Sequence, residues 1–457
     1  MRSRQKDVMD SELFGWQNNR HQLMNAHFNL FRRTLMLAVA WPILASAATN
    51  ITFRTEKPSA VYQPNEQIIW RAEARPEGVN AIIGASYSLK QGGGKLLGAG
   101  RVEFKDGKAT FQFAAADPGT ILAELTCTNR GGQVFHALAG AAVAPERIPV
   151  SLACPDDFDA FWKAKIEELS AVPEHPVIQA AGSGRPGVDY WKIQLDNIRG
   201  THIQGQLARP AAGNKLPAML MVQWAGVYPL QKEWVLDHAA QGWLTLNIMA
   251  HDLPIDQPPS FYQQLAIGAL TNYTAIGNND REKSYFLRMF LACYRAVEYL
   301  SERPDWDGRT LVVTGTSQGG LQSFVAAGLN HKVTGLMALA PAGCDDTGDL
   351  AGRRPGWPYF LANAGSHELQ QVRETSRYFD GVNFAARVTC PALIGLGLID
   401  TTAPPSGVFA AINQLKGPKQ VVVMPEANHH GDNHTHVAYT DRAAVWCADW
   451  VASKPVP

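Results

Sequence analysis

The residues LVVTGTSQGG (311–320) place a run of β-forming side chains directly before a serine that is flanked by glycines. The pattern G-x-S-x-G, from Gly315 to Gly319, is typical of a sharp turn between a strand and a helix. The glycines let the two elements approach closely, and the tight turn exposes the Ser317 hydroxyl to a substrate. The stretch therefore predicts a nucleophilic serine at the end of a strand, although ordinary glycine-rich turns can carry the same pattern.

Two further residues stand in the right places to activate this serine. A serine nucleophile needs an adjacent base, and the base needs a third group that orients it. Asp400 comes directly after the apolar run ALIGLGLI, and His429 comes shortly after the run QVVVM. The carboxyl ends of parallel strands meet at one edge of a sheet, so these side chains are expected to lie together. The chain order Ser, Asp, His is that of the α/β-hydrolase triad.

The acid and the base each leave an alternative open. Asp400, which is followed by Thr401, could cap the next helix. The loop HHGDNHTH (429–436) makes His430 a second candidate for the base, and its histidines and aspartate could also bind a metal, because imidazole and carboxylate are zinc ligands. The spacing matches no standard zinc signature, so the predicted site uses neither a metal nor another cofactor.

The chain divides into three predicted parts. Residues 1–48 are an N-terminal extension with a signal peptide. Residues 49–146 contain short alternating strands such as QIIWRAEA and KATFQFAA, broken by turns such as KDGK and ADPG, which indicates a small all-β sandwich of immunoglobulin-like type. In residues 147–457, apolar strands such as AMLMVQW and WLTLNIM alternate with helix-length stretches, which is typical of a mostly parallel sheet covered by helices. The expected fold class is α/β, an α/β-hydrolase fold preceded by the sandwich.

Three features near the start indicate the signal peptide. Arg32 and Arg33 precede the apolar stretch 34–44, and Ala45-Ser46-Ala47 matches the A-x-A cleavage pattern. The apolar stretch is too short to remain as a membrane-spanning helix. We therefore expect a secreted or periplasmic protein that is cleaved near Ala47 and has no membrane span in the mature chain.

Charge and cysteine content argue against several classes of partner. The 41 lysines and arginines balance the 41 aspartates and glutamates, and no basic stripe stands out, which argues against nucleic acid as a partner. The six cysteines are scattered without paired spacing, unlike those of a zinc ribbon or a disulfide-rich miniprotein.

The chain resembles a known family in four segments. These are CPDDFDAFWKAKIEEL (154–169), the segment from SYFLRMF to TLVVTG (284–315), TGTSQGG (314–320) and the segment from GLIDTTAPP to VVVMPEANHH (397–430). They look like the corresponding parts of acetyl xylan esterases and cephalosporin C deacetylases, which belong to the α/β-hydrolase superfamily. The resemblance covers roughly residues 150–440 and leaves the N-terminal β region outside.

This resemblance implies an activity and a set of roles. It makes Ser317 the nucleophile, Asp400 the acid and His429 the base of an enzyme that removes acetyl or other small acyl groups from carbohydrate, such as acetylated xylan or xylo-oligosaccharides. It also implies a homo-oligomer. The chain departs from the family pattern at two places: Asn428-His429-His430 replaces G-H-E, and Met249-Ala250-His251 replaces R-G-Q.

Ester hydrolysis also requires donors for the negative oxygen of the tetrahedral intermediate. The backbone N–H of Gln318, directly after the nucleophile, is one predicted donor. The second is expected from the loop after AMLMVQW, at Ala225, with Trp224 as the alternative. Trp224 and Tyr228 are predicted to contact substrate by stacking on sugar rings, and the alternative is that they pack in the core or in the wall of the site.

Two other functions fit the same residues. One is a peptidase or thioester hydrolase that uses the same three side chains. The other is a non-catalytic protein with a vestigial site, in which the sandwich binds carbohydrate.

Overall fold

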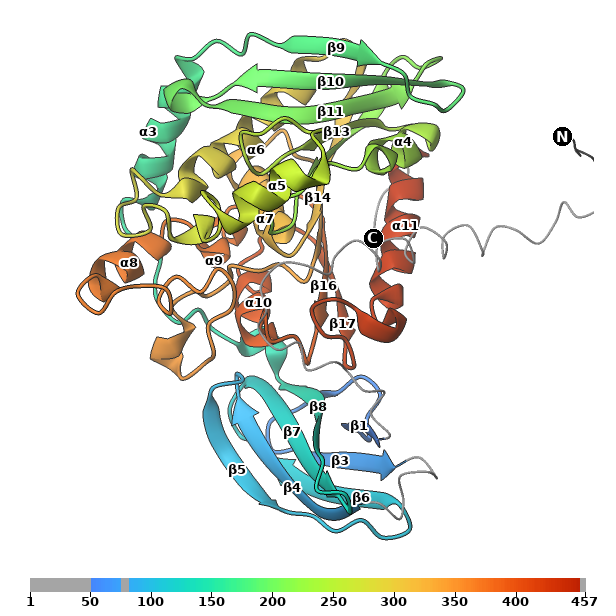
Figure 1. Ribbon diagram of the computed structural model, residues 1–457, viewed down its shortest axis with the longest axis vertical. Coiled ribbons are helices and arrows are strands. Elements are labelled where there is room, and N and C mark those ends of the chain that lie inside the picture. The colour runs from blue at the N-terminus through green and yellow to red at the C-terminus, as the bar shows by residue number, and fades with distance from the viewer. Residues whose placement is uncertain (1–50, 75–81, 453–457) are drawn as a thin grey trace, which may run out of the picture. The chain divides into compact units, whose positions relative to one another are not determined.

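The computed structural model describes residues 51–74 and 82–452. The predicted signal peptide and the cleavage site near Ala47 lie outside these residues. Within the described ranges, no helix combines the length and the apolar character needed to cross a bilayer. Figure 1 shows the N-terminal strands in blue and cyan and the α/β part in green to red.

The first strands form two sheets that share one core. A three-stranded sheet has the order β1 (Ile51–Thr55), β3 (Gln67–Ala74), β6 (Lys108–Ala114), and a five-stranded sheet has the order β2 (Val61–Tyr62), β8 (Val134–Val143), β7 (Gly119–Asn129), β4 (Ile82–Gln91), β5 (Lys95–Arg101). Buried and exposed residues alternate along β1, as expected of a strand with one face in a core. Phe53 and Trp70 of the first sheet and Leu125 of the second lie in the same hydrophobic cluster. The expected all-β sandwich is therefore present.

The rest of the chain is organised around a nine-stranded sheet. Its order is β17 (Lys419–Met424), β16 (Ala392–Gly397), β15 (Gly335–Leu339), β14 (Trp306–Thr316), β12 (Leu216–Val222), β13 (Leu244–Ile248), β11 (His202–Pro210), β10 (Val188–Asp196), β9 (Val177–Ala181). Strands β12 to β17 pair in parallel, and β9, β10 and β11 are antiparallel to their neighbours. This is the mostly parallel sheet that the sequence predicts.

Helices cover both faces of this sheet. The helices that the structure describes in this part of the chain are α3 (Phe158–Ser170), α4 (Lys232–Ala240), α5 (Pro259–Ile267), α6 (Tyr285–Glu302), α7 (Gln318–Leu329), α8 (Leu369–Ser376), α9 (Gly381–Ala385), α10 (Pro405–Ile412) and α11 (Val437–Val451). Successive residues of β14 belong to different clusters: Val313 packs in the core that includes α6 and α7, and Val312 packs in the core that includes Trp446 of α11. In Figure 1, α11 lies on one side of β16 and β17, and α6 and α7 lie on the other. Burial on both faces explains why these strands are apolar throughout.

The strand-to-helix corner at Ser317 is as tight as the glycine pattern predicts. A Cβ added at Gly315 would lie 2.5 Å from the carbonyl carbon of Gly319, and one added at Gly319 would lie 2.7 Å from the Val222 carbonyl oxygen. Ser317 has φ 60° and ψ −121°, a strained conformation for a residue with a side chain. Such strain persists only where the surroundings hold the backbone, as the close packing of β12, β14 and α7 does here.

The sandwich and the α/β part touch through backbone. The Lys95 N–H donates to the Gly352 carbonyl at 3.1 Å, and the Arg354 N–H donates to the Gly92 carbonyl at 2.9 Å. A Cβ at Gly140 on β8 would lie 2.4 Å from the Cβ of Leu398, just after β16. These contacts leave little room between the two parts, and the domain boundary between residues 146 and 147 stays a prediction.

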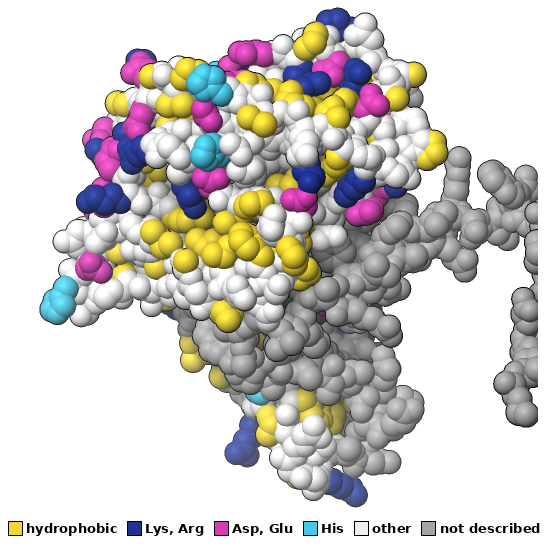
Figure 2. Space-filling view, turned by 45° about the horizontal axis from the view of Figure 1, so that its top comes forward, with side chains coloured by type: hydrophobic (Ala, Val, Ile, Leu, Met, Phe, Trp, Pro, Cys, Tyr) yellow, Lys and Arg dark blue, Asp and Glu magenta, His cyan; other side chains and the backbone are white. Residues whose placement is uncertain are grey.

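The surface carries charges of both signs. On the face shown in Figure 2, the described lysines and arginines are interspersed with aspartates and glutamates, and hydrophobic side chains gather between them. This mixture agrees with the balanced composition of the chain.

We expect Gly315→Ala to destabilise the protein by about 1–3 kcal/mol, because the new methyl group would press on the Gly319 backbone. Gly98→Ala is the matched control: nothing lies within 4 Å of a Cβ at Gly98, so its effect should stay within about 0.5 kcal/mol. Urea unfolding of both variants measures the difference. Equal midpoints for Gly315→Ala and the wild type would contradict the tight corner.

Candidate active site

Ser317 lies at the carboxyl end of β14, where α7 begins. Its N–H donates to the Leu339 carbonyl of β15 at 2.9 Å, and its own carbonyl accepts from the Ala342 N–H at 3.1 Å. The residue is 7% exposed. The backbone N–H and C=O of Ser317 are thus both bonded to the chain at or just after β15. The hydroxyl remains available for contacts with other side chains.

The structure brings Ser317, His429 and Asp400 together in one hydrogen-bonded chain. His429 Nε2 lies 2.8 Å from Ser317 Oγ, and His429 Nδ1 lies 2.7 Å from Asp400 Oδ2. Because a carboxylate accepts, Nδ1 carries the proton and donates to Asp400. The Nε2 lone pair then faces the serine hydroxyl, which donates to it. This is the protonation state in which an imidazole can remove the serine proton.

Asp400 is anchored by more than the histidine. Its second oxygen, Oδ1, accepts from the N–H groups of Thr402 and Ala403, both at 2.8 Å. These bonds hold the turn after β16, whereas α10 begins later, at Pro405. Asp400 therefore caps a turn and not the helix, and it does so with one oxygen while the other oxygen contacts His429. The backbone bonds offset the cost of burying the carboxyl group.

The histidine loop favours His429 over His430. His429 contacts both Ser317 and Asp400, and the His430 ring lies 5.5 Å from the His429 ring at an interplanar angle of 80°. Burial is the main cause that lowers the pKa of His430, and the nearby His429 lowers it further. The loop is closed on itself by Asn428 Nδ2, which donates to Asp432 at 2.8 Å. Among the described residues, no group of three or more histidine, cysteine or acidic side chains could hold a metal.

The turn after β12 carries the other predicted site residues. The Tyr228 hydroxyl donates to the Trp224 carbonyl at 2.9 Å, and the two rings stack at 5.2 Å between centroids. Trp224 also packs against Trp234, at 4.9 Å. Gln223 Nε2 donates to the Tyr228 carbonyl at 3.0 Å. The aromatic rings thus build a folded turn, and the predicted substrate contacts of Trp224 and Tyr228 stay predictions.

Gln318 directly follows the nucleophile and is fully buried. Its side-chain oxygen accepts from the Tyr273 hydroxyl at 2.6 Å, and its Nε2 donates to the Gln223 carbonyl at 3.3 Å. It is the first residue of α7, so its backbone N–H has no partner within the helix. An N–H in that position is available to an anionic oxygen.

His251 is a part of the site that the sequence marked only as a departure from a family pattern. Its Nε2 lies 3.0 Å from the Gly226 carbonyl, and its Nδ1 lies 2.6 Å from the Tyr285 hydroxyl. Its ring meets Tyr273 edge-on, at 4.9 Å between centroids. Burial lowers the pKa of His251 to about 4, so the imidazole is neutral at ordinary pH. Tyr273 lies outside the segments that resemble the family and Tyr285 lies inside one of them, but no pattern in the sequence assigns either tyrosine to the site.

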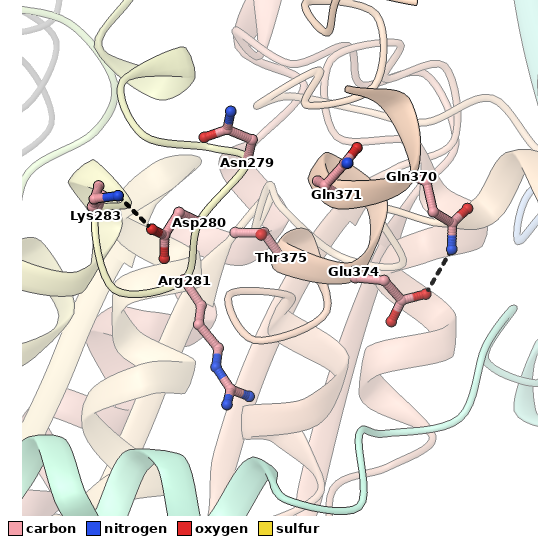
Figure 3. Close-up of a pocket in the computed structure, with 8 residues that line it drawn as sticks. All are labelled: Asn279, Asp280, Arg281, Lys283, Gln370, Gln371, Glu374 and Thr375. Carbon is pink, nitrogen blue, oxygen red and sulfur yellow. Dashed lines mark hydrogen bonds and ion pairs between the residues drawn. The ribbon is translucent and has the colours of Figure 1, made fainter. Parts of the chain in front are cut away.

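A separate hollow opens between the segment before α6 and helix α8. Its lining is polar and consists of Asn279, Asp280, Arg281, Lys283, Gln370, Gln371, Glu374 and Thr375. Figure 3 shows Lys283 paired with Asp280 and Gln370 bonded to Glu374, while Arg281 points away from these side chains. The hollow contains none of the predicted site residues.

The fold and its serine corner define the class: the protein is a serine carboxylic ester hydrolase of the α/β-hydrolase fold. A model of the acetyl xylan esterase family (AXE1) matches residues 150–449. The chain therefore belongs to the acetyl xylan esterase family, as the sequence segments indicated.

Individual relatives agree with this assignment. The chain is 30% identical over 343 residues to the acetyl esterase Axe7A of Xylanibacter ruminicola, which covers 74% of this chain and 77% of the relative. An acetyl xylan esterase from Paenibacillus sp. R4 is 25% identical, with a TM-score of 0.55 over 66% of this chain and 98% of its own. Acetyl xylan esterase 1 from Thermoanaerobacterium sp. JW/SL YS485 has the same fold, at 21% identity and a TM-score of 0.56 over 67% of this chain and 97% of its own.

The neutral state of His251 predicts a pH dependence of stability. Because burial keeps its folded-state pKa near 4, below the ordinary 6.5, its contribution is complete above pH 6.5 and is lost as the pH falls toward 4. Between about pH 7 and about pH 4.5, the wild type should therefore lose about 2 kcal/mol more free energy of unfolding than His251→Gln. Urea unfolding at both pH values tests this, and equal losses in the two proteins would rule it out.

Proposed function

We propose that this protein is an exported esterase that removes acetyl groups from acetylated xylan or xylo-oligosaccharides, with Ser317, His429 and Asp400 as its catalytic triad. The observation that carries the proposal is the chain of hydrogen bonds from Asp400 through His429 to Ser317, at 2.7 and 2.8 Å. Membership of the acetyl xylan esterase family supports the choice of an acetylated carbohydrate as the substrate.

The reaction would proceed in two stages. In the first, His429 Nε2 takes the hydroxyl proton as Ser317 Oγ attacks the acetyl carbonyl carbon, and Asp400 stabilises the imidazolium that forms. The tetrahedral intermediate collapses, His429 gives its proton to the departing sugar oxygen, and acetyl-Ser317 remains. In the second stage, His429 takes a proton from water, the resulting hydroxide attacks the acyl carbon, and acetate leaves as Ser317 regains its proton.

The negative oxygen of each intermediate needs preset donors. We assign these roles to the backbone N–H groups of Gln318 and Ala225. Gln318 supports the assignment because its N–H lies at the start of α7, where the helix dipole also favours negative charge. One such donor typically lowers the barrier by about 3–4 kcal/mol. Trp224 and Tyr228 lie on the same turn as Ala225 and would form the nearby wall of the substrate site.

Ser317→Ala should reduce the rate of acetate release by at least about 10⁴-fold, because no other group can form the acyl-enzyme. Ser323→Ala is the matched control. Ser323 is buried on the same helix and its hydroxyl donates to the Gly319 carbonyl at 2.8 Å, so its loss should affect stability more than turnover. Acetate release should be measured on acetylated xylo-oligosaccharides, simple acetyl esters, longer acyl esters and matched amides.

The substrate panel also decides between the competing functions. Activity that is confined to amides or thioesters would contradict carbohydrate deacetylation. Undiminished acetate release by Ser317→Ala would contradict the triad itself.

We also propose that residues up to Ala47 are removed on export. The support is the order of Arg32 and Arg33, an apolar stretch, and Ala45-Ser46-Ala47. N-terminal sequencing of protein recovered from the periplasm or the medium should find a first residue close to Ala48. A recovered protein that still contains Arg32 and Arg33 would contradict the prediction.

A further inference from the structure

The turn from Trp224 to Tyr228 is held by its carbonyl oxygens. The Trp224 carbonyl accepts from the Tyr228 hydroxyl at 2.9 Å, and the Gly226 carbonyl lies 3.0 Å from His251 Nε2. A trans peptide unit is planar, and its C=O and N–H point in opposite directions. Fixing the Trp224 carbonyl therefore fixes the direction of the Ala225 N–H, and fixing the Gly226 carbonyl fixes that of the Val227 N–H.

The first of these bonds comes from a well-restrained side chain. The Tyr228 ring stacks on Trp224 at an interplanar angle of 26°, and the Tyr228 carbonyl accepts from Gln223 Nε2 at 3.0 Å. Burial holds the pKa of the Tyr228 hydroxyl well above its usual range, so it keeps its proton and donates. The side chain thus reaches back four residues along its own turn and orients the peptide unit that contains the Ala225 N–H.

The bond from His251 to the Gly226 carbonyl has only one possible direction, because the contacts of both ring nitrogens determine which of them carries the proton. A carbonyl oxygen only accepts, so Nε2 must carry the proton and donate to Gly226. Nδ1 is then unprotonated, and it accepts from the Tyr285 hydroxyl at 2.6 Å. Gly226 itself has φ 120°, a conformation that a residue with a side chain rarely adopts and that glycine permits, and the bond from His251 holds its carbonyl in one direction.

The same buried cluster reaches the nucleophile. The Tyr273 ring lies against both His251 and Tyr285, at 4.9 and 5.4 Å between centroids. The Tyr273 hydroxyl donates to the side chain of Gln318, the residue that carries the other proposed N–H donor. The 224–228 turn and the start of α7 carry the two proposed donors. Both contact the same group of neutral side chains: His251 bonds to the turn, and Tyr273 bonds to Gln318.

We propose that Tyr228 and His251 are positioning residues for ester hydrolysis, which hold the peptide units of the 224–228 turn so that the oxyanion donor is oriented before the substrate binds. The inference rests on the proposed function, because it assigns a role to side chains around the Ser317 site. Neither side chain exchanges a proton with the substrate. Each acts through a backbone carbonyl, and its loss should let the turn sample orientations in which the N–H points away.

The decisive variant is Tyr228→Phe, which removes one oxygen atom and keeps the ring that stacks on Trp224. If the donor is aligned in only one-tenth to one-hundredth of the molecules, kcat for an acetyl ester should fall by about 10- to 100-fold. KM should change by less than about twofold, because the donor acts on the transition state. The affinity for a trifluoromethyl ketone, which forms a tetrahedral adduct with the serine, should fall by the same factor as kcat/KM.

Tyr299→Phe is the matched control. Tyr299 is also buried on the α/β part, and its hydroxyl accepts from the Arg303 guanidinium at 2.7 Å. It lies on α6 about 20 Å along the helix from Tyr285, at a rise of about 1.5 Å per residue. This variant loses a buried tyrosine hydrogen bond as well, but its kcat and its affinity for the ketone should stay within about twofold of the wild type.

A second pair of variants tests His251. His251→Leu removes the donor to Gly226, whose carbonyl belongs to the peptide unit two positions beyond that of Ala225 N–H. It acts on the Ala225 N–H only through the rest of the turn, so it should lower kcat by less than Tyr228→Phe does. His251→Gln keeps an N–H donor of similar reach and should recover a substantial part of that loss. If His251→Leu does not fold, Tyr228→Phe against its control still decides the question.

The outcomes separate this inference from the proposed function. Labelling of wild-type Ser317 by a fluorophosphonate, together with loss of turnover in Ser317→Ala, establishes the reaction independently of the turn. If that holds and Tyr228→Phe keeps the wild-type kcat and ketone affinity, the positioning role is wrong. A rise in KM at unchanged kcat would likewise overturn it, because Tyr228 would then only line the substrate site. If wild-type Ser317 is not labelled, the proposed function itself fails.

Discussion

At the corner between β14 and α7, the Gly319 backbone occupies the space that a side chain on Gly315 would need. At this tight corner Ser317 has a positive φ, and its hydroxyl lies 2.8 Å from His429 Nε2. The corner is held by β15 through the Ser317 N–H and by β12 through the Gly319 contact with Val222. Everything else in the site is built around a serine whose position is set by backbone packing.

The parallel part of the sheet then brings the partners of the serine to it. Asp400 follows β16 and His429 follows β17, and parallel neighbours of β14 and β15 end at the same edge. Each partner is fixed by bonds that do not involve the serine: Asp400 by two backbone N–H groups, and the histidine loop by its own internal bonds. Because these bonds hold the acid and the histidine loop in place, little reorganisation of the three side chains is needed during the reaction.

The sequence predicted the residues that follow apolar strands and missed those that act across the fold. Ser317, Asp400 and His429 could be predicted as candidates because a buried parallel strand is a continuous apolar run, and its end is easy to locate. His251, Tyr273 and Tyr285 contact Gly226, Gln318 and one another, and no local period or motif links such distant positions. Strands β9, β10 and β11 were not singled out either, because β9 is largely exposed and β10 mixes polar with apolar residues.

The contact between β8 and the end of β16 has a consequence for how this enzyme can be shortened. Gly140 lies directly against Leu398, two residues before Asp400, and the Gly92 and Lys95 backbone pairs with the segment around Gly352. A fragment that contained only the nine-stranded sheet and its helices would expose Leu398 to solvent. The Gly352 carbonyl and the Arg354 N–H would also lose their backbone partners. The sandwich thus packs directly against the segment that leads into Asp400, so a side chain added at position 140 would press on that segment.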